Sequence, residues 1–380
     1  MVRVVVIGAG VVGSAVAAGL VRRGARVTVL EARTPGAGTT ATSVAWVNAN
    51  NKTPKEYFDL NRAAVWAHHR LPGDWFFPTG HLECAVTDEH KQLLEGRVAR
   101  LVSWGYPVER VAARRARDLE PDLVPYAGAE YAFYPTEAYV HPLRLVGRLL
   151  GEARDGGAVV ECGAEVAAIE TPAHGVRVTV ADGRAYAGDV VVTCAGRWTQ
   201  RVAALAGVTV PMLDPAESGA VTNGFLVTTT PLAARLSRKL TTSGLNLRPD
   251  GGGRLVLQRL RLDGRAVAGE PVPDDVVGEI MGELPKVLRA TEGAEAERAV
   301  VGQRAMPADG LTVAGFADVG RRVYTVATHS GITLAPLLME EVAGEVFGED
   351  SELLAPFRPG RFAAGTAGPA PVPARRPGQQ

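Results

Sequence analysis

The first thirty-one residues constrain the fold of this 380-residue chain more than any other segment. Residues 1–7 are a short apolar run rich in β-branched side chains, which is typical of a fully buried parallel strand. The glycine-rich turn Gly8-Ala9-Gly10-Val11-Val12-Gly13 follows. Residues 14–23 then predict a helix, and residues 26–30 predict a second strand that runs into Glu31. This order predicts a βαβ unit.

The glycine spacing in this unit predicts a dinucleotide site. In a G-x-G-x-x-G turn the first glycine (Gly8) allows the tight turn, the second (Gly10) lets the backbone approach a pyrophosphate, and the third (Gly13) allows close packing of helix on strand. Glu31 ends the second strand, where a carboxylate can accept hydrogen bonds from both ribose hydroxyls. Because 44 of the 380 residues are glycine, a glycine-rich turn in some other α/β protein stays open as the alternative.

Composition and charge narrow the classes of protein that this chain can belong to. Its length suggests two domains, and 41 basic residues balance 41 acidic ones, so we expect neither nucleic acid nor a membrane surface as a partner. Cys84, Cys162 and Cys194 are too few and too scattered for a metal site or a disulfide framework, which favours the cytoplasm. We expect no signal peptide, no membrane span, and a disordered tail at 359–380.

The remaining pattern alternates helices and strands up to about residue 212 and then changes. Helices are predicted at 55–70, 88–104 and 142–153, with strands at 157–161, 165–170 and 189–194 and a hairpin over 176–186. Segments 225–230, 244–249 and 254–258 predict antiparallel strands, residues 274–288 a helix, and 323–327 a last strand before a helix that ends near 347.

Four stretches in this order resemble the D-amino-acid oxidase superfamily of FAD-dependent enzymes. They are the N-terminal unit through Arg33, then residues 138–142, 190–198, and 302–310 with 314–315 and 328–336. The pattern is most similar to glycine oxidases and D-amino-acid dehydrogenases. The resemblance covers residues 2–350 and implies a Rossmann-like FAD domain of the glutathione-reductase type from 1–75, 140–212 and 300–350. A second, mainly antiparallel substrate domain would comprise 76–139 and 213–299.

The resemblance also implies which residues hold FAD, which we expect to be bound non-covalently. The cofactor-binding residues it implies are Gly8, Gly10, Val11, Val12, Gly13, Glu31, Ala32, Arg33, Thr39, Thr40, Ala41, Val166, Gly196, Trp198, Ser330, Gly331, Ile332, Thr333 and Leu334. Of these, 331–334 would direct a helix N-terminus at the edge of the flavin where negative charge collects on reduction.

The implied reaction is oxidation of the C–N bond of a small amine or amino acid, by hydride transfer to flavin N5, to give an imine. The resemblance identifies Arg304 as a clamp for a substrate carboxylate, while a structural salt bridge near the domain junction is its alternative role. Further substrate-binding candidates are His329, His81, Asn48, Tyr134 and Gln258; Asn50 and Lys52 follow Asn48 in the same loop, and His141 is more readily structural. No catalytic acid, base or metal ligand is identified.

Three points stay open at this stage. Ala305, Val256 and Thr333 depart from residues that the family or its sarcosine oxidases carry at those places, so the electron acceptor is O2 or another molecule. An NAD(P)H-dependent flavin monooxygenase begins with the same βαβ unit and is the first alternative function. A non-catalytic flavoprotein subunit is the second. The oligomeric state is not predicted.

Overall fold

The computed structural model describes residues 1–216 and 221–362 and contains two large sheets. The first has six strands in the order β19-β20-β13-β1-β2-β9. All neighbours are parallel except the edge pair β19 and β20. The strand bounds are β1 Arg3–Ile7, β2 Arg26–Glu31, β9 Val159–Cys162, β13 Val190–Thr193, β19 Val313–Phe316 and β20 Val323–Ala327. The N-terminal βαβ unit therefore lies at the centre of this sheet.

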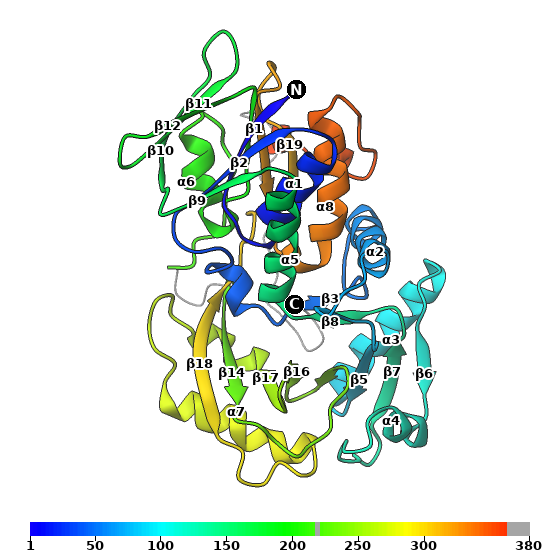
Figure 1. Cartoon of the computed structure of the whole chain (residues 1–380). Coiled ribbons are helices and arrows are strands. Elements are labelled where there is room, and N and C mark those ends of the chain that lie inside the picture. The colour runs from blue at the N-terminus through cyan, green and yellow to red at the C-terminus, as the bar shows by residue number, and fades with distance from the viewer. Residues whose placement is uncertain (217–220, 363–380) are drawn as a thin grey trace.

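Helices cover one face of the six-stranded sheet, and a small antiparallel sheet covers the other. Helix α1 (Val11–Arg22) lies between α5 (Pro142–Asp155) and α8 (Gly331–Val346), as Figure 1 shows. A Cβ on Gly19 would lie 1.8 Å from the Met339 carbonyl oxygen, so α1 and α8 pack this closely only because Gly19 has no side chain. The opposite face packs on β10 (Val166–Glu170), β11 (Val176–Val180), β12 (Ala185–Gly188) and α6 (Thr199–Ala204).

The second sheet has eight strands and is antiparallel except for the pair β15 and β5. Its order is β18 (Ala296–Gln303), β14 (Asn223–Thr229), β17 (Arg254–Gln258), β16 (Asn246–Gly251), β15 (Lys239–Thr242), β5 (His81–Ala85), β7 (Glu130–Tyr134) and β6 (Glu109–Val111). Helix α7 (Asp274–Val287) buries Val276, Ile280 and Leu284 in the same core as this sheet. Helices α3 (Asp88–Ser103) and α4 (Ala113–Leu119) contact β7.

Short elements connect the two large sheets and form the region between them (Figure 1). They are the 3-10 helix η1 (Thr39–Thr42) and a three-stranded sheet of β3 (Trp46–Val47), β8 (Ala138–Val140) and β4 (Phe76–Phe77). Helix α2 (Lys55–His69) follows β3 and packs on α8. Further 3-10 helices are η2 (Gly196–Trp198), η3 (Leu260–Arg265) and η4 (Ala355–Phe357).

The predicted fold class, a Rossmann-like α/β domain joined to a mainly antiparallel domain, is confirmed by these two sheets. The start of the tail predicted at 359–380 has structure: Pro359–Phe362 form a 3-10 turn, and Arg361 pairs with Asp309 at 2.7 Å. The rest of that tail, 363–380, lies outside the described residues, as do 217–220 within the predicted substrate domain. Of the described helices, none has the length and apolar character needed to cross a membrane.

Candidate active site

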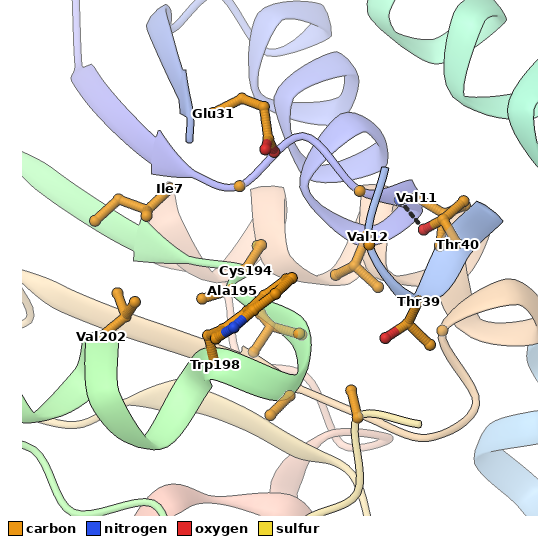
Figure 2. A pocket seen from close by; sticks show the side chains of 18 of the residues that line it. Ile7, Val11, Val12, Glu31, Thr39, Thr40, Cys194, Ala195, Trp198 and Val202 are labelled. Carbon is orange, nitrogen blue, oxygen red and sulfur yellow. Dashed lines mark hydrogen bonds between the residues drawn. The ribbon is translucent and has the colours of Figure 1, made fainter. Parts of the chain in front are cut away.

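The larger of two adjoining cavities lies at the carboxyl ends of β1, β2 and β13 and has a volume of about 480 Å³. Carboxyl ends of parallel strands are where ligands bind in open α/β sheets. The N-terminus of α1, η1 and the first turn of α8 contribute to its wall, and Figure 2 shows Glu31, Thr39, Thr40 and Trp198 around the space. The cavity is therefore built mainly by the N-terminal βαβ unit.

The turn between β1 and α1 requires glycine at two positions. Gly8 has a φ of +100°, and a Cβ there would lie 2.5 Å from the Cys194 carbonyl oxygen. A Cβ on Gly13 would lie 1.9 Å from the carbonyl oxygen of Gly8. The backbone can thus hold the N-terminus of α1 close to the cavity, where its N–H groups and positive dipole end favour a phosphate.

Glu31 is held in place by two backbone N–H groups. Its Oε2 accepts from the Ala9 N–H at 2.8 Å, and its Oε1 accepts from the Arg33 N–H at 2.9 Å. Glu31 also lines the larger cavity. A carboxylate has about four acceptor sites on its two oxygens, so these two bonds orient the group and leave it able to accept from ribose hydroxyls.

The 3-10 helix η1 forms hydrogen bonds both to the cofactor turn, which is the turn between β1 and α1, and to the second sheet. Val11 N donates to Thr40 Oγ1 at 3.1 Å, the bond dashed in Figure 2, and Thr39 Oγ1 donates to the Gln303 carbonyl at 2.7 Å. Gly302 passes so near η1 that a Cβ on it would lie 2.8 Å from the Thr42 carbonyl oxygen. The end of β18 is thereby fixed against the wall of the cavity.

Trp198 forms part of the opposite wall. The guanidinium carbons of Arg33 and Arg197 lie 5.2 Å and 4.0 Å from the centre of its ring, distances at which a cation is attracted to an aromatic face. The ring lies 3.3 Å from the position that a Cβ on Gly38 would take. Trp198 therefore reaches from η2 toward the loop after β2.

The predicted cofactor residues gather here with few exceptions. Those that line the larger cavity are Gly8, Gly10, Val11, Val12, Glu31, Ala32, Arg33, Thr39, Thr40, Val166, Gly196, Trp198, Gly331 and Ile332. Ser330 and Thr333 line the smaller cavity instead, where Ile332 and Thr39 contribute as well. Gly13, Ala41 and Leu334 line neither: Gly13 packs under Gly8, and Leu334 is fully buried.

These observations fit FAD. The glycine cradle would hold the pyrophosphate, Glu31 the adenosine ribose, and Val166 the region of the adenine, while Gly331 and Ile332 place the N-terminus of α8 at the other end. Lining residues that were not predicted to bind the cofactor include Gly36, Ser43, Ala164, Arg201 and Thr328. Gly36, Ser43 and Ala164 lie in loops that carry no spacing signal, and Arg201 lies in α6.

The smaller cavity, of about 60 Å³, adjoins the α8 end of the larger one. Thr39, Ser43, His329 and Ile332 line both. Its other lining residues come from the loop after η1, from the second sheet and from α8: Thr42, Val44, Trp46, Lys52, Gly224, Leu226, Gln258, Gly302, Arg304, Ser330 and Thr333. Lys52 and Arg304 contribute positive charge, and no Asp or Glu of the described residues lines it.

Arg304 lies in this wall and is also part of an ion pair. Its Nη2 donates to Asp263 Oδ2 at 2.9 Å, and its Nη1 donates to the carbonyl oxygens of Val221 (3.2 Å) and Asn223. These contacts use three of the five N–H groups of a guanidinium. Gly224 leaves room for the pair, since a Cβ there would lie 2.7 Å from both Nη2 and Oδ2.

Gln258 and His329 are the other predicted substrate residues that line the smaller cavity. Gln258 Nε2 donates to Asp263 Oδ2 at 3.3 Å, so the carboxylate of Asp263 joins Gln258 and Arg304. Beside them, Lys52 is 5% exposed with Nζ 5.9 Å from the centre of the Tyr57 ring. The Tyr57 hydroxyl bonds to Ser330 Oγ at 2.8 Å, and burial raises the pKa of Tyr57.

Three predicted substrate residues lie outside both linings. His81 and Tyr134 stack at 5.0 Å inside the second sheet, where His81 bonds to Thr241 Oγ1 (3.0 Å) and the Tyr134 hydroxyl donates to Glu83 (2.8 Å). Burial lowers the pKa of His81. Asn48 is buried, and its backbone N–H donates to Thr333 Oγ1 at 3.3 Å.

Two other features bear on the chemistry of the site. The sequence did not single out Trp46, Gly224 or Asp263, although the first two line the smaller cavity and the third pairs with Arg304. Within residues 1–216 and 221–362, no group of three or more His, Cys, Asp or Glu side chains is arranged to hold a metal ion.

Comparison with known proteins agrees with this geometry. The family model described as FAD dependent oxidoreductase (DAO) matches residues 3–344. Glycine oxidase of Geobacillus kaustophilus (strain HTA426) is 25% identical over 372 residues, which are 93% of this chain and 95% of that protein. A crystal structure of the glycine oxidase from Geobacillus kaustophilus superposes with a TM-score of 0.83 at 23% identity, covering 96% of this chain and 100% of that one.

A second solved structure, L-proline dehydrogenase from P. horikoshii, has a TM-score of 0.83 at 20% identity and covers 96% of this chain and 98% of its own. Because the family model spans nearly all of the described residues, it confirms the resemblance and the predicted non-covalent FAD. The protein is therefore a member of the DAO family of FAD-dependent oxidoreductases.

Proposed function

We propose that this enzyme oxidises the C–N bond of a small amine or amino acid that binds in the smaller cavity. The family relatives named glycine oxidase and iminodiacetate oxidase support an amino-acid substrate. When bound, FAD would supply the acceptor for the hydride that leaves the carbon next to nitrogen. The protein's own residues then have to bind and orient the substrate and exclude water.

The charge of the smaller cavity is the observation that carries this proposal. Lys52 and Arg304 line it, no described acidic residue does, and the N-terminus of α8 adds its positive dipole end. Such a cavity favours an anionic group, and a carboxylate matches the guanidinium of Arg304. Three of the five N–H groups of Arg304 bond to residues that the structure describes, and we propose that the other two donate to the substrate carboxylate.

The other residues of the cavity have narrower roles in the proposal. Gln258 lies beside Arg304 and would contact the substrate's polar groups, while His329 lines both cavities and so stands where substrate and cofactor would meet. His81, Tyr134 and Asn48 would act on the substrate only through the walls that they support.

Anaerobic reduction of the purified holoprotein by a panel of amines and amino acids, followed by air, tests the proposal. Bleaching of the flavin by a member of the panel supports it, and return of colour in air identifies O2 as an acceptor. Bleaching by NADPH with no amine present would instead favour a monooxygenase. No bleaching by any amine or by NADPH would favour a non-catalytic subunit.

A matched pair of variants tests the carboxylate clamp. Arg304→Met should raise the ratio of the KM for an amino acid to the KM for the amine that lacks its carboxylate. The expected increase corresponds to about 2–4 kcal/mol of binding free energy, the cost of losing a desolvated pair between Arg304 and the substrate carboxylate. Arg298→Met, in the strand that ends just before Arg304 and exposed, is the control and should leave that ratio unchanged. An unchanged KM in Arg304→Met would assign Arg304 to its alternative role as a structural salt bridge.

We further propose that the enzyme works in the cytoplasm. Cys84, Cys162 and Cys194 are all free thiols, and burial raises the pKa of Cys84 to about 12. Thiols without disulfide partners are typical of a reducing compartment. Fractionation of the native host with an antibody against the protein would test this assignment.

A further inference from the structure

Trp46 is the largest side chain in the wall of the smaller cavity. It belongs to β3, is 2% exposed, and lines the cavity together with Lys52, Leu226 and Arg304. Because the cavity is only about 60 Å³, the position of one indole ring decides much of the space left for a substrate.

Three buried side chains hold the indole of Trp46. Its Nε1 donates to Glu137 Oε2 at 3.1 Å, the Lys239 ammonium lies 5.0 Å from the ring centre, and the His81 ring meets it edge-on at 4.6 Å. The side chains of Glu137 and His81 are fully buried, as is Lys239. The ring is therefore fixed by one hydrogen bond, one cation–π contact and one aromatic contact.

The backbone around Trp46 is fixed as firmly as its side chain. Glu137 Oε1 accepts from the N–H groups of Ala49 (3.1 Å) and Asn50 (3.0 Å), and its Oε2 accepts from Asn50 Nδ2 at 3.0 Å. Thr333 Oγ1 donates to the Trp46 carbonyl at 3.2 Å. Displacing this segment would leave several buried polar groups unpaired, which is costly in a protein interior.

A wall that cannot move limits what the cavity admits. Packed interiors do not deform continuously, and a substrate group larger than the available space is rejected. A flexible aromatic side chain would swing aside for a larger group, but the contacts of the Trp46 indole with Glu137, Lys239 and His81 would all have to break for it to do so.

We propose that Trp46 is a specificity-determining residue that restricts the substrate to amino acids with a small side chain, of the size of glycine or alanine. This inference rests on the proposed function, since it takes the smaller cavity to be the substrate site. Glu137, His81 and Lys239 are positioning residues, because they act on the substrate through Trp46.

The test replaces Trp46 with leucine and measures two ratios in the holoenzyme. The first is kcat/KM for leucine over kcat/KM for alanine, with both enantiomers of each. The second is the dissociation constant, by calorimetry, of 4-methylpentanoate relative to propionate, which lack the amine and cannot react. Both ratios should shift toward the larger ligand by about 10-fold or more, the effect expected when a pocket gains room for added methylene groups.

Three further variants separate this role from a general loss of structure. Trp75→Leu removes another buried tryptophan, one outside both cavity linings, and should leave both ratios unchanged. Glu137→Gln keeps the indole but removes its carboxylate acceptor, and should shift the ratios in the same direction as Trp46→Leu by a smaller factor. Trp46→Phe is the milder replacement if the leucine variant does not fold.

The outcomes distinguish this inference from the proposed function. If no amine and no amino acid bleaches the wild-type flavin, the proposed function fails, and the calorimetric ratio still reports on the wall. If wild type oxidises amino acids but Trp46→Leu and Trp46→Phe leave both ratios unchanged, Trp46 does not set specificity. Equal activity of wild type on alanine and leucine would overturn the inference as well.

Discussion

Replacing Asp263 with asparagine separates the two roles that Arg304 can have. In the native protein Asp263 Oδ2 lies 2.9 Å from Arg304 Nη2, and the two side chains are 9% and 14% exposed. Breaking a buried pair by neutralising one partner costs about 3–5 kcal/mol, because the other charge stays buried. Asparagine still offers an acceptor oxygen, so we expect the lower limit, about 3 kcal/mol, in the free energy of unfolding.

The same variant changes the electrostatics of the smaller cavity. With Asp263 neutral, the charge of Arg304 is no longer balanced, and a carboxylate bound in the cavity would supply the missing counter-charge. Acetate should therefore bind Asp263→Asn about 10-fold more tightly than wild type, and should recover part of the lost stability by mass action. Chemical denaturation of the holoprotein with and without acetate, together with calorimetry, measures both effects.

Asp309→Asn is the matched control for this experiment. Asp309 forms a comparable ion pair with Arg361 at side-chain exposures of 13% and 21%, and neither residue lines either of the two cavities described above. It should lose stability without any change in acetate affinity. If Asp263→Asn and Asp309→Asn had the same acetate affinity, the reasoning that Arg304 faces a substrate anion would be refuted.

Three further predictions concern cofactor binding and pH. Gly13→Ala should purify with little FAD, since its Cβ would lie 1.9 Å from the Gly8 carbonyl oxygen; Gly147→Ala, with no atom within 4 Å of the new Cβ, should keep a full complement by flavin absorbance. Glu31→Gln should weaken FAD binding by about 1.5–3 kcal/mol in a titration of the apoprotein, and an unchanged affinity would remove Glu31 from the cofactor site. Burial lowers the pKa of Lys239 from 10.5 to about 7, so the folded state binds fewer protons than the unfolded state between those values. Stability of wild type relative to Lys239→Met should then rise with pH from about 7 to 10, by at most about 1.4 kcal/mol per unit, and a flat difference would contradict a buried, depressed lysine.

The elements nearest the cofactor could be predicted because their signals are local. The β-branched runs, the glycine spacing and Glu31 lie within one short segment, and the structure has β1 at Arg3–Ile7 and β2 at Arg26–Glu31. The start of the helix differs most: α1 begins at Val11 instead of residue 14, because the turn glycine Gly10 is itself the N-cap. The first turn, Val11-Val12-Gly13-Ser14, carries no amphipathic period to mark that start.

The smaller cavity was harder to predict because its residues meet across long sequence separations. Asp263 is 41 residues from Arg304, and Trp46 is 91 residues from Glu137. Neither contact leaves a periodic signal in the sequence. His81 and Tyr134 illustrate the reverse case: they are register partners on β5 and β7 whose rings stack. Their polar groups bond inside the sheet, to Thr241 and Glu83 respectively, instead of reaching a ligand.

The junction of η1 with β18 makes the two cavities thermodynamically dependent on each other. Thr40 bonds to the cofactor turn, and its neighbour Thr39 bonds to Gln303, the residue before Arg304. A ligand that orders this junction from one side lowers the conformational entropy that the other ligand has to remove. Cofactor and substrate should therefore bind with positive cooperativity, and reciprocity requires that a carboxylate ligand lower the dissociation constant of FAD by the same factor by which FAD lowers the dissociation constant of that ligand.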